Sequence, residues 1–178
     1  MILAWRGNKM FRGLYPKDYF ESTYCINFKK YYMLGYRGVI FDIDNTLVEH
    51  DAPADERAMN LITNLKEIGF EICFLSNNDE ERVKNFNESL DCHYIHKAGK
   101  PLAKGYNKAM KLMGTDRMST LFVGDQIFTD IWGANNAGIR SVLVKPIAKH
   151  EEIQIVLKRI PEKLILFFYL KKHKLKSR

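Results

Sequence analysis

The sequence lacks long apolar runs. Its longest candidate, from Leu164 to Leu170, has seven residues, whereas a helix that spans a membrane needs about 20. The first fifteen residues also lack the apolar stretch of roughly 7–15 residues found in secretion signals. We therefore expect neither a transmembrane nor a secreted protein. Because no acidic residue precedes Asp18, an organelle transit peptide stays open as an alternative at this end.

Cysteine is also scarce. The chain contains Cys25, Cys73 and Cys92, an odd number without close spacing, which favours neither a disulfide framework nor a zinc site. This usage is typical of a reducing compartment, and we expect a cytoplasmic protein. Internal repeats and low-complexity tracts are absent from the sequence. A chain of 178 residues then predicts one domain of ordinary size.

The charges are divided unevenly along the chain. The net charge is +5 for residues 1–37, −5 for residues 38–152 and +7 for residues 153–178. Basic segments attract the phosphates of nucleic acids or anionic lipids, although a basic tail can also be only a solvated end. The first 37 residues additionally hold ten of the 22 aromatic residues, which suits packing on a core.

Short apolar runs alternate with amphipathic stretches from residue 38 onward. We expect strands at 38–42, 71–76, 92–95, 120–123 and 139–144, and helices at 55–68, 79–90, 102–113 and a short segment ending at 137. This alternation predicts right-handed βαβ units. The expected fold class is a Rossmann-like three-layer α/β sandwich around a mostly parallel, five-stranded sheet.

We divide the chain into three parts on this basis. Residues 1–37 form a basic, aromatic-rich N-terminal segment, residues 38–148 the α/β core, and residues 149–178 a basic C-terminal helix or tail. Within the last part, residues 150–171 have the pattern of a helix interrupted at Pro161. We expect both ends to pack on the core, to lie on an anionic membrane, or to do both.

Polar residues stand where the predicted strands end. In open α/β sheets, ligands bind beyond the carboxyl ends of the strands. The residues at these positions are Asp42 and Asp44 after the first strand, Ser76 and Asn77 after the second, Lys100 before the third helix, and Asp125 and Asp130 after the fourth strand. Their order along the chain predicts that they meet in one pocket.

Four carboxylates in one pocket require a counter-charge. Two carboxylates about 4 Å apart repel by roughly 4 kcal/mol at an effective dielectric constant near 20. Oxygen-only ligands favour Mg²⁺, which also accepts phosphate oxygens. Carboxylates, Mg²⁺, a lysine and a hydroxyl are together the parts of a phosphoryl-transfer site.

The motifs resemble those of the haloacid dehalogenase-like (HAD) superfamily of phosphatases. The first motif resembles FDIDNTL at 41–47, the second LSNN at 75–78, the third the pair Lys100 and Pro101, and the fourth GDQIFTD at 124–130. The similarity runs from about Tyr15 to the tail and is nearest to the YqeG-type family of subclass IIIA. That family is similar to phosphatases that act on phosphatidylglycerophosphate. The first fourteen residues carry no family signal.

The resemblance implies a role for each matching residue. Asp42 would attack phosphorus and form an aspartyl-phosphate, while Asp44 would protonate the leaving oxygen and then deprotonate water. Lys100 would offset negative charge, and Ser76 would bind a phosphoryl oxygen. The remaining implied roles belong to Thr46 and Asn77 as auxiliaries at the phosphate, to Asp42, Asp125 and the Asp44 backbone carbonyl as Mg²⁺ ligands, and to Asp130 as support of the metal site.

The spacing between motifs bears on the substrate. Thirty positions separate Thr46 from Ser76 and twenty-four separate Ser76 from Lys100, which is too few for a folded lid, so we expect a capless, open site. An open site suits a bulky or surface-bound phosphomonoester, and the basic ends suggest a phospholipid phosphate, with the protein peripheral at the inner face of a membrane. We regard nucleic acid as an unlikely partner. The alternatives are the same chemistry on a soluble metabolite, a nucleic-acid end or a phosphoprotein, or a regulatory protein that binds phosphate without turnover.

Overall fold

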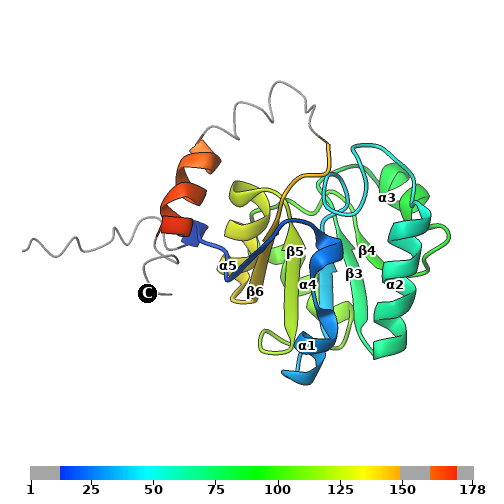
Figure 1. Cartoon of the computed structure of the whole chain (residues 1–178). Coiled ribbons are helices and arrows are strands. Elements are labelled where there is room, and N and C mark those ends of the chain that lie inside the picture. Colours follow the sequence, from blue (N-terminus) through cyan, green and yellow to red (C-terminus); the bar gives the residue numbers. More distant parts are fainter. Residues whose placement is uncertain (1–12, 149–160, 172–178) are drawn as a thin grey trace, which may run out of the picture.

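The computed structural model describes residues 13–148 and 161–171. These residues form a twisted β-sheet flanked by α-helices (Figure 1). Its sheet has six strands in the order β1-β6-β5-β2-β3-β4, and every pairing is parallel. The strands are β1 (Asp18–Phe20), β2 (Gly38–Phe41), β3 (Glu71–Leu75), β4 (His93–Ile95), β5 (Thr120–Gly124) and β6 (Arg140–Val144). The predicted Rossmann-like fold class is confirmed.

Helices cover both faces of the sheet. They are α1 (Phe28–Met33), α2 (Glu56–Ile68), α3 (Glu80–Asn87), α4 (Ala103–Leu112) and α5 (Trp132–Ala137), with a 3-10 turn η2 (Thr23–Cys25) and a π-helix η3 (Ile127–Ile131). Alternate strand residues point to opposite faces. Val39 and Phe41 of β2 therefore pack with the α1, α2 and α3 side, whereas Ile40 packs with the side of α4 and α5. The result is the three-layer sandwich expected from the sequence.

The expected strand count of five is wrong, because β1 adds a sixth strand at the edge of the sheet. Asp18, Tyr19 and Phe20 pair with residues 142–144 of β6. The strand has only three residues and none is fully buried, so it shows neither the apolar run nor the alternation by which strands are recognised. Arg140 fixes it in place through two hydrogen bonds to the Asp18 carboxylate, at 2.6 and 3.0 Å.

The chain reverses its direction across the sheet between β2 and β5. From β2 it proceeds outward through β3 to β4, and it returns to the other side of β2 with β5 and β6. The carboxyl ends of β2 and β5 therefore form the topological switch point where such sheets bind ligands. Asp42 follows β2 there and Asp125 follows β5, so the fold brings two predicted site residues together.

The described part of the C-terminal region is a helix over 161–171, drawn in orange and red in Figure 1. Ile165 packs with Ile127, Ile131 and Leu143, and the Tyr169 ring lies 5.9 Å from the ring of Tyr15. The first half of the predicted helix at 150–171 lies outside the described residues. Across the described ranges, none of the helices has the length and apolar content required to cross a bilayer.

Candidate active site

Lys100 joins two buried carboxylates at the carboxyl edge of the sheet. Its Nζ donates to Asp42 Oδ1 at 2.5 Å and to Asp130 Oδ1 at 2.8 Å. The three side chains come from three separate segments, the loop after β2, the loop after β4 and the π-helix η3, and each is at least nine-tenths buried. The second oxygen of Asp130 accepts from the backbone N–H of Gln126 at 3.0 Å. Asp130 is therefore fixed at both oxygens.

Burial and the neighbouring charges shift the pKa values of Asp42 and Lys100. Burial raises the pKa of Asp42, Lys100 opposes the rise and Asp130 adds to it, so that the pKa is about 7. Burial alone would lower the pKa of Lys100, but Asp130 and Asp42 outweigh burial and raise it above its usual range. Lys100 therefore stays positively charged. The two carboxylates that contact it carry more negative charge, when both are ionised, than this one ammonium group balances.

Asp125 completes a cluster of three carboxylates. Oxygens of Asp42, Asp125 and Asp130 lie within 4.8 Å of one another, and all three residues are buried. The Thr46 hydroxyl lies 3.2 Å from Asp42 Oδ2 and 3.4 Å from Asp125 Oδ1, and it can donate to either. Together with Lys100, the three carboxylates carry a formal charge of −2. An all-oxygen donor set of this charge fits a divalent cation such as Mg²⁺.

Ser76 and Asn77 follow β3 beside this cluster. The Asn77 side chain donates to the Lys100 carbonyl at 3.2 Å and accepts from the Lys100 N–H at 2.8 Å. Its amide thus fixes the backbone of Lys100, a positioning contact that the sequence did not indicate. The buried Ser76 hydroxyl oxygen accepts from the Asn78 N–H at 3.1 Å.

The Asp44 carboxylate lies outside the cluster of three carboxylates. It belongs to a second group, the Asp44 network, that the sequence did not predict: Arg82 and Asn78 each donate to it at 2.8 Å, and the Asp51 N–H donates at 3.0 Å. His50 Nδ1 is 3.6 Å from the same carboxylate. Asn78 is 34 and Arg82 is 38 positions from Asp44 in the sequence, so these side chains meet only in the folded chain. Asn78 precedes the N-cap residue Asp79 and Arg82 lies in the first turn of α3, so no helical spacing in the sequence links the two.

Two segments that are distant in the sequence, one before β2 and one after β6, hold the loop that follows Asp42. The Thr23 hydroxyl donates to the Thr46 carbonyl at 2.7 Å, and the Tyr24 hydroxyl donates to the Leu47 carbonyl at 2.5 Å. From the other side, the Ile147 N–H donates to the Asn45 carbonyl at 3.0 Å. The N-terminal segment thereby shapes the loop that carries Asp44 and Thr46.

The segment that follows β5, which contains Asp125 and the π-helix η3 with Asp130, is held by steric and polar contacts. A Cβ atom on Gly124 would lie 2.6 Å from Asp130 Oδ2, so only glycine fits before Asp125. The buried Glu162 accepts from the backbone N–H groups of Ile127 and Phe128, at 2.7 and 3.2 Å. The helix at 161–171 therefore contacts this segment through Glu162.

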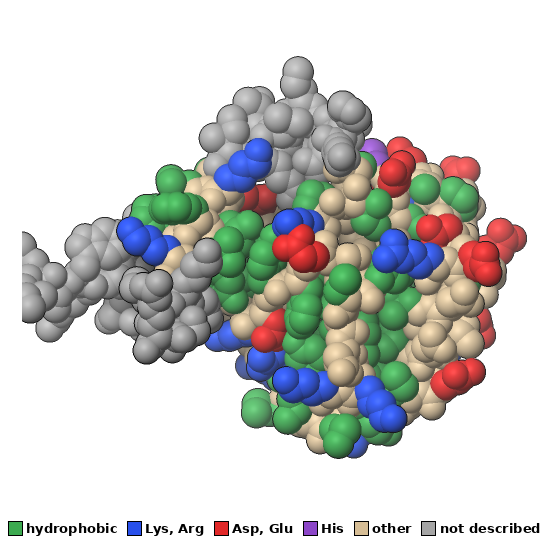
Figure 2. All heavy atoms as spheres, in the orientation of Figure 1, with side chains coloured by type: hydrophobic (Ala, Val, Ile, Leu, Met, Phe, Trp, Pro, Cys, Tyr) green, Lys and Arg blue, Asp and Glu red, His purple; other side chains and the backbone are tan. Residues whose placement is uncertain are grey.

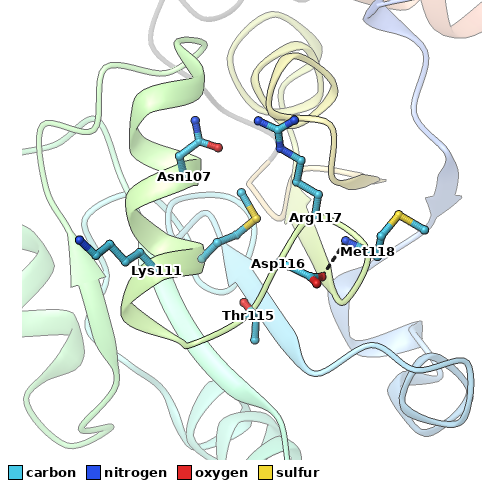
Figure 3. A pocket seen from close by; sticks show the side chains of 7 residues that line it. Asn107, Lys111, Thr115, Asp116, Arg117 and Met118 are labelled. Atoms are coloured by element: carbon cyan, nitrogen blue, oxygen red, sulfur yellow. Dashed lines mark hydrogen bonds between the residues drawn. The ribbon is translucent and has the colours of Figure 1, made fainter.

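A depression of about 560 Å³ lies at the opposite edge of the sheet (Figure 3). It is formed by α4 and the loop that leads into β5, and its lining residues are Asn107, Met110, Lys111, Thr115, Asp116, Arg117 and Met118. Because the strands are parallel, this edge is remote from their carboxyl ends. None of the predicted site residues lines it.

Comparison with known proteins identifies the family. A family model described as haloacid dehalogenase-like hydrolase matches residues 50–138. The chain is also 36% identical over 152 residues to "Probable phosphatase YqeG" of Bacillus subtilis (strain 168), covering 85% of this chain and 88% of that protein. The chain belongs to the haloacid dehalogenase-like hydrolase family. This family membership was predicted from the motifs, and it supports a phosphatase.

Two further comparisons bear on this hydrolase. It is 28% identical over 139 residues to "Phosphatidylglycerophosphate phosphatase 1, chloroplastic/mitochondrial" of Arabidopsis thaliana, covering 68% of this chain but only 38% of that protein. The structure of NagD from E. coli K-12 superimposes with a TM-score of 0.52 at 13% identity, over 64% of this chain and 90% of that chain. The structural match supports the fold.

Proposed function

We propose that this hydrolase cleaves phosphomonoesters through a covalent intermediate on Asp42. The observation that carries the proposal is a buried cluster of three carboxylates at the switch point of the sheet, two of which share one ammonium group. The cluster consists of Asp42, Asp125 and Asp130, and Lys100 joins Asp42 to Asp130. Asp42 has the most exposed side chain of the three that meet at the ammonium group, at 9% against 4% for Lys100 and 1% for Asp130. It is therefore within reach of a substrate that enters from the edge.

The reaction has two steps. An Asp42 oxygen attacks phosphorus, the bond from phosphorus to the ester oxygen breaks, and the departing oxygen takes a proton from Asp44. Asp44, now a carboxylate, removes a proton from water, and that water attacks the same phosphorus. The bond from phosphorus to Asp42 then breaks, which releases inorganic phosphate and regenerates both aspartates.

The other residues support these steps. Lys100 offsets charge on Asp42 and on the phosphoryl group, and Ser76 binds a phosphoryl oxygen. Mg²⁺ would be held by Asp42, Asp125 and the backbone carbonyl of Asp44. Asp130 would support this site, and its own carboxylate is held by hydrogen bonds from Lys100 and from the Gln126 N–H. A bound cation would stabilise the charge on the phosphoryl oxygens.

We propose a phospholipid phosphate, such as that of phosphatidylglycerophosphate, as the substrate. Two features support this choice. The similarity to the plant phosphatase named for that lipid is one. The second is the lack of an inserted domain between Thr46 and Lys100, where the chain forms only α2, β3, α3, β4 and their loops.

The helix at 161–171 supports a peripheral contact with an anionic membrane. It buries Glu162, Ile165 and Tyr169 but exposes apolar and basic side chains, which lie side by side in Figure 2. The exposed ones are Lys163, Leu164, Phe167, Phe168, Leu170 and Lys171. Such a surface suits an interface of anionic headgroups and acyl chains. Glu162 holds the helix against the segment that follows Asp125, so a membrane contact would bring the lipid phosphate near the site.

Phosphate release from a substrate panel tests this function. The panel contains an aryl phosphate, phosphatidylglycerophosphate in mixed micelles, glycerol 3-phosphate and a 5′-phosphorylated oligonucleotide, each with and without Mg²⁺. We expect Mg²⁺-dependent turnover with the lipid preferred. Turnover of glycerol 3-phosphate or the oligonucleotide in its place would contradict the lipid assignment, and phosphate binding without release would point to a regulatory protein.

A vesicle assay tests the membrane contact separately. Binding to phosphatidylglycerol vesicles should exceed binding to phosphatidylcholine vesicles and should fall in Phe167→Ser/Phe168→Ser. Leu112→Ser, which replaces another exposed apolar residue on α4, is the matched control. Equal binding by the double variant and the wild type would contradict a contact through this helix.

A further inference from the structure

Asp44 is held by donors from two segments that are separate in the sequence. Its Oδ1 accepts from Arg82 Nη2 at 2.8 Å and from the Asp51 N–H at 3.0 Å, and its Oδ2 accepts from Asn78 Nδ2 at 2.8 Å. Asp51 lies in the loop after Asp44, whereas Asn78 lies just before the N-cap of α3 and Arg82 in the first turn of that helix. A carboxylate with three such donors is confined to one side-chain orientation.

The hydrogen bonds distinguish the two oxygens of Asp44. Each carboxylate oxygen offers about two acceptor positions. Among the described residues, Oδ1 has donors for both of its positions, and His50 Nδ1 lies 3.6 Å from it as well. Oδ2 has one donor and keeps one position available. Oδ2 is therefore the oxygen of Asp44 that can hold or take a proton.

Arg82 is itself rigidly placed. Its backbone N–H donates to the Asp79 carboxylate at 2.9 Å as part of the N-terminal cap of α3, and the next residue, Val83, is fully buried. The guanidinium group lies 5.7 Å from the centre of the Phe86 ring, and its Nε is 3.6 Å from Asp51 Oδ1. Only 11% of the Arg82 side chain is exposed, against 14% of the Asp44 side chain. This pair is thus shielded from water, where a charge-assisted hydrogen bond is strongest.

We propose that Arg82 is a positioning residue that orients Asp44 for proton transfer at Oδ2. The inference rests on the proposed acid–base role of Asp44. Arg82 occupies Oδ1, so the proton passes from Oδ2 to the leaving oxygen in the first step and returns to Oδ2 from water in the second. Asn78 assists by fixing the rotation of the carboxylate. Arg82 does not touch the reacting atoms.

Leaving-group dependence tests this role. An aryl phosphate has a stable leaving anion that needs little protonation, whereas an alkyl phosphate such as phosphatidylglycerophosphate needs a proton from Asp44. We expect Arg82→Gln to lower kcat on the alkyl phosphate by about 10- to 100-fold, the scale of a misplaced catalytic group, and on the aryl phosphate by less than about 3-fold. Arg82→Lys should recover part of the loss. Combining Arg82→Gln with Asp44→Asn should add little to Asp44→Asn alone.

A matched control lies on the same helix. Lys84→Gln removes a positive charge from an exposed pair with Glu80, and it should leave both substrates unaffected. An equal loss on both substrates in Arg82→Gln, or an effect confined to KM, would overturn the proposal in favour of a general structural or substrate-binding role.

A readout without turnover separates this inference from the proposed function. The ¹³Cγ resonance of Asp44, assigned by its loss in Asp44→Asn, should shift in Arg82→Gln and stay in place in Lys84→Gln. An unchanged resonance in Arg82→Gln would overturn the positioning role whatever the activity. A shifted resonance in a protein that hydrolyses no phosphomonoester would contradict the proposed function but support the contact between Arg82 and Asp44.

Discussion

Lys100 Nζ lies 2.5 Å from Asp42 Oδ1, and the two side chains are 4% and 9% exposed. The residues are 58 positions apart in the sequence, on loops after β2 and β4. Because Lys100 also contacts Asp130, one ammonium group is shared by two buried carboxylates. The lysine is therefore the main compensation for the buried negative charge, and in the proposed reaction it is also the group that would neutralise an incoming phosphate.

Replacing this lysine should affect stability and activity together. Lys100→Met leaves buried carboxylates uncompensated, and we expect the free energy of unfolding to fall by about 3 kcal/mol and phosphate release to fall by at least about 100-fold. Urea unfolding and steady-state assays measure the two effects. Lys104→Met, at an exposed position on α4, is the control and should match the wild type in both. A fully active Lys100→Met would contradict the role given to the ammonium group.

Gly124 is a second sensitive position. Gly124→Ala would place Cβ within 2.7 Å of Asp130 Cγ and Phe122 Cε1, so Asp130 must move. We expect a loss of about 1–3 kcal/mol in stability, the usual cost of overpacking, and weaker activity because Asp130 no longer meets Lys100. Gly13→Ala serves as the control, since its Cβ would be 3.7 Å from the nearest Trp132 atom, an ordinary contact. Similar melting temperatures for the two variants would show that the loop can relax.

Metal binding should be visible in thermal stability. At ten times its dissociation constant, Mg²⁺ stabilises the folded state by about 1.4 kcal/mol, which corresponds to a rise in Tm of a few degrees. We expect the rise in the wild type, its loss in Asp125→Ala, and its persistence in Asp44→Asn, because Asp44 would supply only its backbone carbonyl. A rise that persists in Asp125→Ala would place the cation elsewhere.

Stability should also fall at alkaline pH. Burial raises the pKa of Cys73 to about 12 and that of Cys92 to about 11, from 9.0. Above pH 9 the unfolded chain loses these protons while the folded chain keeps them, so the free energy of unfolding decreases with rising pH until the folded values are passed. For Cys73 the slope is about 1.4 kcal/mol per pH unit. Unfolding curves between pH 8 and 11 measure it, and Cys73→Ala should reduce the slope, whereas Cys25→Ala, at an exposed position, should not.

Much of this arrangement could be predicted from local sequence. Asp42 and Asp125 each end a short apolar run, and a parallel sheet brings such ends to one edge. Strand β1 could not be predicted in this way, since Asp18, Tyr19 and Phe20 are recognisable only through their pairing with β6. The contact between Arg82 and Asp44 likewise depends on how α3 approaches the loop after β2, which no periodicity encodes.

The most direct test of Asp42 as the nucleophile is phosphate release by Asp42→Asn under Mg²⁺, compared with the wild type. The control is Glu67→Gln, which removes one exposed carboxylate from α2. Asparagine preserves the shape of the side chain but is a poor nucleophile. We expect kcat to fall by at least about 1,000-fold in a protein that is still folded, while Glu67→Gln retains wild-type activity. Undiminished turnover by Asp42→Asn would contradict the assignment of Asp42 as the nucleophile.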